Sequence, residues 1–107
     1  MKAENFDGHQ VAIHLLEEVV VDQLQLIDLA CWGITGREAV ITSAKDRTHQ
    51  PYSLHYKGLA VDIRTHGVDD VDLDRLRVHL AEALGKSWDV VLESDHMHIE
   101  YDPKRMQ

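Results

Sequence analysis

Residues 59–101 read LAVDIRTHGVDDVDLDRLRVHLAEALGKSWDVVLESDHMHIEY and contain the clearest secondary-structure signals of the chain. In residues 59–64, the large apolar side chains of Leu59, Val61 and Ile63 alternate with Ala60, Asp62 and Arg64. This alternation predicts a strand with one face toward a core. Asp62 falls on the opposite face of that strand. Residues 88–92 and 96–101 predict two further strands, and the break between them predicts a hairpin.

Two segments have the spacing of helices. Residues 70–84 carry leucines at helical spacing and acidic side chains in the first turn, and Gly85 follows directly. Residues 16–31 also carry apolar side chains at steps of three and four, which predicts a first helix. The β-branched valines 19–21 leave open that a strand begins there instead. Residues 39–42 predict a short buried strand.

The rest of the chain shows no periodic pattern. Residues 45–57 are polar and include a proline, which predicts a long loop that carries His49 and His55. Residues 1–8 are polar and predict an unanchored N-terminus. We therefore expect one α+β domain over residues 1–107, a small antiparallel sheet with helices packed on one face and the functional site on the other.

The amino-acid composition and net charge limit the classes of partner that the protein can have. The chain has 107 residues, 44% hydrophobic and 28% charged, as in a globular domain. Nineteen acidic against eleven basic residues give a net charge of −8, which repels phosphate backbones and anionic lipid surfaces. We therefore expect neither nucleic acid nor a membrane as partner. Cys31 stands alone, so it forms no internal disulfide, and its apolar surroundings predict a packed thiol.

The beginning of the chain, MKAENFDGHQ, lacks the basic region and apolar run of a secretory signal. No run of about 18 apolar residues occurs anywhere in the sequence. We expect a monomer that is soluble and cytoplasmic as synthesised.

The first chemically informative stretch is SLHYKGLAVD, residues 53–62. His55 precedes the predicted strand and Asp62 lies within it. Gly58 lies between them and can adopt the turn that would fold one toward the other.

The second stretch is ESDHMHIEY, residues 93–101. His96 and His98 are two residues apart, so on a strand both imidazoles leave from the same face. A catalytic zinc site needs three protein ligands and a fourth position for water, and histidine and aspartate are suitable ligands. The two stretches together therefore predict a zinc site.

The first stretch resembles the signature of the zinc D-Ala-D-Ala carboxypeptidases and dipeptidases. Every constrained position of the pattern Ser-x-His-x-x-Gly-x-Ala-x-Asp is matched, by Ser53, His55, Gly58, Ala60 and Asp62.

The second stretch is similar to the second motif of that family, best known in its phage endolysin branch. The matching residues are Asp95, His98 and Glu100 in the pattern Asp-x-x-His-x-Glu. The run SLHYKGLAVDIRT is also close to a stretch of the hedgehog signalling domain, which shares the fold. The resemblance covers residues 39–101 and implies a hedgehog/DD-peptidase-like fold.

Carried over by position, the resemblance implies that His55, Asp62 and His98 are the zinc ligands. An acidic residue three before the last ligand acts as general base in the peptidases, which favours Asp95. Alignment on the hedgehog-like Glu-Ser pair selects Glu93 instead, and both alternatives stay open. Either carboxylate would take a proton from the attacking water and pass it to the leaving amine.

The resemblance also suggests roles for neighbouring residues. His96 would polarise the substrate carbonyl or stabilise the oxyanion, and His49 matches a histidine near the metal in the hedgehog-like branch. Arg47 lies one position from the arginine that holds the substrate's carboxylate or the oxyanion in the peptidases. Glu100 either supports a ligand or solvates its strand.

The resemblance implies a zinc metallopeptidase that hydrolyses a peptide bond next to a D-amino acid in bacterial cell-wall peptidoglycan. A compact chain of this kind suits a phage or prophage protein that acts at the cell wall. Two alternatives stay open. One is a non-catalytic zinc-binding module of the same fold used for adhesion or assembly, and the other is a cytosolic dipeptidase that acts on free D,D-dipeptides.

Overall fold

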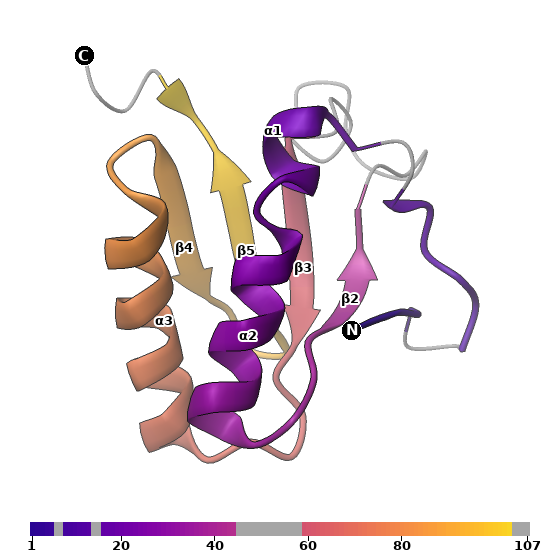
Figure 1. The fold of residues 1–107 in the computed structure, drawn as a ribbon. Helices are drawn as coiled ribbons and strands as arrows, with labels where there is room; N and C mark the ends of the chain where they lie inside the picture. The colour runs from indigo at the N-terminus through magenta and orange to yellow at the C-terminus, as the bar shows by residue number, and fades with distance from the viewer. Residues whose placement is uncertain (6–7, 14–15, 45–58, 104–107) are drawn as a thin grey trace.

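The structure is a computed structural model that describes residues 1–5, 8–13, 16–44 and 59–103 (Figure 1). Within these residues the chain forms five strands and three helices. In chain order they are β1 (Lys2–Ala3), α1 (Glu18–Val21), α2 (Leu24–Thr35), β2 (Val40–Ser43), β3 (Ala60–Arg64), α3 (Asp70–Leu84), β4 (Trp88–Leu92) and β5 (His96–Tyr101).

The strands form one sheet in the order β1-β2-β3-β5-β4, so β3 lies at its centre. The pairs β2–β3, β3–β5 and β5–β4 are antiparallel, whereas β1 pairs parallel with β2. The predicted α+β class is confirmed. β2 to β5 form the predicted small antiparallel sheet, and β1, which was not predicted, adds a parallel edge strand that makes the whole sheet mixed.

The N-terminus is anchored, contrary to the prediction from its polar sequence. The backbone N–H of Lys2 donates to the carbonyl of Ala39 at 2.9 Å, and that of Glu4 donates to the carbonyl of Ile41 at 2.9 Å. A two-residue strand is held by backbone groups and is too short to show a side-chain period, so the sequence carries no signal for it.

The first predicted helix is divided in two by a turn at Asp22 and Gln23. The valines of residues 19–21 are helical and lie in α1, so the alternative of a strand there is wrong. α2 continues past the predicted end at Cys31 to Thr35. It stops at Gly36, whose φ of 72° is left-handed and therefore favours glycine.

The second half of the chain matches its prediction closely. α3 covers residues 70–84, with Asp70 and Asp72 in its first turn and Gly85 just beyond its end. β4 and β5 form the predicted hairpin, which is closed by a hydrogen bond from the N–H of Glu93 to the carbonyl of His96 at 2.8 Å.

Figure 1 shows α2 and α3 over the same face of the sheet. Between helices and sheet lies the hydrophobic core, whose largest fully buried side chains include Ile27, Ile41, Ile63, Leu80 and Ile99. No helix in the described part of the chain is long and apolar enough to cross a membrane.

Candidate metal centre

The candidate site lies on the sheet face opposite the helices, where β3 and β5 run side by side. Val61 and Ile63 of β3 point into the core. Asp62, between them, must therefore point to the other face. In the antiparallel ladder Asp62 is the direct cross-strand partner of His98. The predicted orientation of Asp62 away from the core side is confirmed.

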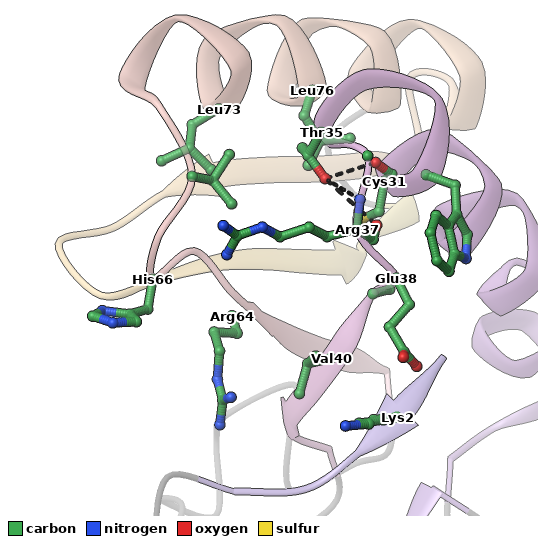
Figure 2. Close-up of a pocket in the computed structure, with 14 residues that line it drawn as sticks. Lys2, Cys31, Thr35, Arg37, Glu38, Val40, Arg64, His66, Leu73 and Leu76 are labelled. Carbon is green, nitrogen blue, oxygen red and sulfur yellow. Dashed lines mark hydrogen bonds between the residues drawn. The ribbon is translucent and has the colours of Figure 1, made fainter.

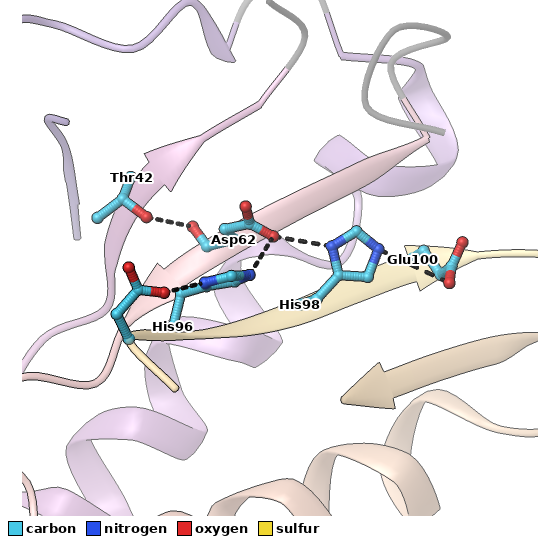
Figure 3. A network of polar contacts seen from close by, with 6 residues as sticks. Thr42, Asp62, His96, His98 and Glu100 are labelled. Atoms are coloured by element: carbon cyan, nitrogen blue, oxygen red, sulfur yellow. Dashed lines mark hydrogen bonds and ion pairs between the residues drawn. The ribbon is translucent and has the colours of Figure 1, made fainter. Parts of the chain in front are cut away.

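The carboxylate of Asp62 and the imidazole of His98 are in direct contact (Figure 3). Oδ1 of Asp62 lies 2.8 Å from Nδ1 of His98. The side chains are only 12% and 21% exposed, respectively. A hydrogen bond in such a sheltered place is stronger than at an open surface.

A bulge in β2 lies beside this pair. Ile41 pairs with Ile63, but Ser43 pairs with Asp62, so β2 has one extra residue at Thr42. The hydroxyl of Thr42 donates to the backbone carbonyl of Asp62 at 3.4 Å. The bulge thereby supports the strand at the position of the carboxylate.

His96 and Asp95 extend the polar network along β5. Nε2 of His96 lies 3.7 Å from Oδ1 of Asp62, and its Nδ1 lies 2.6 Å from Oδ1 of Asp95. The Asp95 side chain is 68% exposed, so solvent reaches its carboxylate. His96 therefore connects a buried carboxylate with an accessible one.

Two glutamates lie near His98. Oε1 of Glu100 lies 3.6 Å from Nε2 of His98, on the side away from Asp62 (Figure 3). Glu93 is exposed at the hairpin, and its charge also acts on His98.

The pKa of His98 reflects opposing influences. Burial lowers it, but the hydrogen bond and charge of Asp62, together with the charges of Glu100 and Glu93, raise it by more. The net result is a pKa above the ordinary value for histidine. The surrounding carboxylates therefore favour a cation at this position, whether a proton or a metal ion.

The donor chemistry of the site suits zinc, since imidazole and carboxylate are both zinc ligands. Two ligands of one tetrahedral zinc ion lie about 3.4 Å apart, given bond lengths of about 2.0–2.2 Å. The contact of 2.8 Å between Asp62 and His98 is a hydrogen bond, so this pair must separate slightly to share a metal. The 3.7 Å between His96 and Asp62 is closer to ligand spacing.

The remaining predicted site residues, His55 and Arg47, lie outside the described residues, as does His49. Among the residues that the structure describes, no group of three or more histidine, cysteine, aspartate or glutamate side chains is arranged to hold a metal ion. The structure thus brings together Asp62, His98, His96 and Asp95, and the third zinc ligand implied by the resemblance belongs to the segment it does not describe.

Two polar residues next to the site were not singled out from the sequence. Arg64 shares the face of Asp62 and pairs with His96 across the strands. The alternation of residues 59–64 already contained this signal. Thr42 had no such signal, because its contact depends on a bulge between strands that are distant in sequence.

In comparisons with known proteins, the chain matches no family model, no curated protein and no solved structure. The residues of the two motifs and their geometry are therefore the observations that bear on function.

Proposed function

We propose that the chain is a zinc metallopeptidase that hydrolyses a peptide bond next to a D-amino acid in bacterial cell-wall peptidoglycan. The observation that carries this proposal is the direct contact between Asp62 and His98. These residues come from two separate motifs, 36 positions apart, and meet on the polar face of the sheet. Two unrelated polar residues would not be expected to become direct cross-strand partners by chance.

Asp62 and His98 would hold zinc together with His55. When bound, zinc supplies Lewis-acid activation of water and of the scissile carbonyl. If the hydrogen bond between Asp62 and His98 breaks, both side chains still face the same space, because they are held on adjacent strands of the sheet. The negative charges that raise the pKa of His98 would also favour a divalent cation there.

Asp95 is the proposed general base. Its carboxylate is open to solvent, so it can accept a proton from the attacking water and give it to the leaving amine. His96 contacts Asp95 through Nδ1, and its Nε2 lies 3.7 Å from Oδ1 of Asp62, so it would stand between the base and a proposed zinc ligand. Glu93 is the alternative base, because its charge acts on His98.

The test is the release of amine from two substrates, purified peptidoglycan and free D-Ala-D-Ala, by protein loaded with zinc and by the same protein after chelation. Zinc-dependent release from peptidoglycan alone supports an endopeptidase. Release from the dipeptide alone would indicate the dipeptidase. Release from neither would leave the binding module as the better hypothesis.

A matched pair of variants makes this test specific. Asp62→Asn should abolish zinc-dependent release, because it removes a proposed ligand from the centre of the sheet. His79→Ala changes an exposed histidine of α3 and should leave the release unchanged.

A further inference from the structure

A groove of about 690 Å³ lies along the helix layer, between α2 and α3. Its lining includes four apolar residues of α2, namely Leu26, Leu29, Ala30 and Ile34, and His79 of α3. Ile34 and His79 also line a second hollow of about 430 Å³, which extends the groove along α3. We call the two hollows together the outer groove. Since both helices cover one face of the sheet (Figure 1), the sheet separates this groove from the candidate metal centre.

The outer groove exposes large apolar side chains. Leu29 is 61% exposed and Val78, in the extension along α3, is 40% exposed. Ile27, two residues before Leu29 in the same helix, is fully buried in the core. Two residues correspond to about 200° around a helix, so Leu29 faces nearly opposite to the core. Exposed apolar side chains that gather at a groove are typical of a site that contacts another molecule.

A glycine inside α2 has the same orientation. Gly33 follows Leu29 by four residues, so the two lie on one side of the helix, and Gly33 also lines the outer groove. Glycine is among the least favourable residues inside a helix, and the end of α2 is already served by Gly36. A Cβ added to Gly33 would meet no atom of the described residues within 4 Å. Packing within the described chain therefore does not require glycine here, whereas close approach of another backbone would.

The opposite flank of α2 is engaged inside the fold. Oδ1 of Asp28 accepts a hydrogen bond from the backbone N–H of Ala39 at 2.9 Å. Cys31 and Thr35 line a different pocket, beside β2, where the hydroxyl of Thr35 donates to the carbonyl of Cys31 at 2.7 Å (Figure 2). The outer groove is therefore the side of α2 that is open to a partner.

The two ends of the outer groove differ in charge. Asp22 and Glu82 line it at the end where α2 begins and α3 finishes (Figure 1). Within the part of the chain that the structure describes, neither carboxylate takes part in an ion pair. At the other end, Asp74 is paired with Arg77 at 2.6 Å. The first end therefore presents negative charge that a cationic partner would neutralise.

We propose that the outer groove binds an amphipathic helix of a partner protein, with apolar residues against Leu29 and Val78 and basic residues beside Asp22 and Glu82. Helix-in-groove recognition places such apolar anchors at helical spacing. The 12 residues of α2 span about 18 Å, which matches a partner helix of about three turns. A second copy of the chain is disfavoured, because each copy has a net charge of −8. This inference depends neither on zinc nor on peptidase activity.

The experiment is a titration of the isotope-labelled full chain with synthetic peptides, followed by the amide signals in two-dimensional NMR. The probe is a leucine–lysine peptide of about 12 residues, or three turns, with leucines at helical spacing. We expect saturable shifts at Leu29, Gly33 and Val78. A leucine–glutamate peptide with the same leucine positions, and a scrambled leucine–lysine peptide, should each bind about 10-fold more weakly or worse.

Surface variants make the result specific. Leu29→Gln and Gly33→Gln should each weaken binding of the leucine–lysine peptide by about 10-fold or more, as expected for central contacts. Gly33→Gln should also raise the melting temperature, because glutamine is a better helix former than glycine, so lost binding cannot be ascribed to unfolding. Val71→Gln is the matched control. Val71 is 71% exposed on α3 but does not line the outer groove, so binding should be unchanged.

Four outcomes would overturn the proposal. They are the absence of saturable shifts, shifts centred on His98, equal affinity of wild type and Leu29→Gln, and equal affinity for the lysine and glutamate peptides. Sedimentation provides a further check. A dimer that forms with rising concentration and is lost in Leu29→Gln would assign the groove to a second copy instead. None of these measurements uses zinc or peptidase activity, so failure here is distinguishable from failure of the zinc site.

Discussion

Asp62 and His98 are direct cross-strand partners at the middle of the sheet, with 2.8 Å between Oδ1 of one and Nδ1 of the other. Neighbouring acidic groups raise the pKa of this histidine despite its burial. The pair is sheltered and rigidly placed, and it is joined through His96 to an accessible carboxylate. These properties lead to predictions that can be tested separately.

The first prediction concerns the metal. The protein should bind one zinc ion per chain. His98→Ala should lower zinc affinity by more than about 100-fold, because about 100-fold is the largest usual loss when a residue that only supports a ligand is removed. Metal analysis after dialysis measures this directly. His96→Ala is the informative companion, because His96 lies 3.7 Å from Asp62. If only His96→Ala loses the metal, the ligand assignment is wrong.

The second prediction concerns the fold without metal. Chelation should lower the melting temperature by on the order of 4–8 °C for each kcal/mol of lost binding free energy. The transition should stay cooperative, because the core between the sheet and α2 and α3 does not depend on the site. Calorimetry with and without chelator measures both quantities. A chain that has no transition after chelation would contradict this expectation.

The third prediction concerns the general base. Asp95→Asn should retain zinc and lose turnover by about 10²–10⁴-fold, the usual contribution of a positioned base. Glu93→Gln should cost much less. Rates and metal content of both variants decide between them, and the reverse order would assign the role to Glu93. Small and equal losses would favour the binding module.

The fourth prediction is a pH dependence of the chelated protein. The folded-state pKa of His98 is raised, so protonated His98 stabilises the fold. This stabilisation is complete below the unfolded pKa of about 6.5 and is lost as pH rises through the folded-state value. The difference in unfolding free energy between wild type and His98→Gln should therefore shrink with rising pH. In an Asp62→Asn background it should be smaller at low pH, and an unchanged difference there would contradict the role of Asp62.

The fifth prediction concerns Cys31, a buried residue of α2. Burial, followed by the charge of Asp28, raises its pKa to about 12. The thiolate is the reactive form, so a thiol reagent at neutral pH should label the native protein far more slowly than the protein unfolded in urea. Rapid labelling of the folded chain would show that the thiol is accessible.

The sequence predicted those elements whose signals are local. α3 begins and ends where the leucine spacing, the early acidic residues and Gly85 indicate. The β4–β5 hairpin also follows from two short alternating runs with a break between them. By contrast, β1 was missed, because parallel pairing of two residues with β2 leaves no pattern in their side chains.

The candidate site was partly predictable for the same reason. The alternation of side chains along each strand placed Asp62 on the polar face of β3, and it placed His96 and His98 on one face of β5. It did not show that β3 and β5 are neighbours. That adjacency is a property of the sheet order. The contact between His96 and Asp95 was missed, since it depends on how the side chains turn at the start of β5.

The central position of β3 affects how the site responds to thermal opening. Sheets open locally from their edges, and here the edges are β1 and β4. Asp62 and His98 lie on inner strands, so amide exchange at these two positions should require nearly global unfolding. Fraying of the termini would leave the site intact, and no partial opening would loosen it alone. Heat should consequently separate Asp62 from His98 only together with the unfolding of the sheet itself.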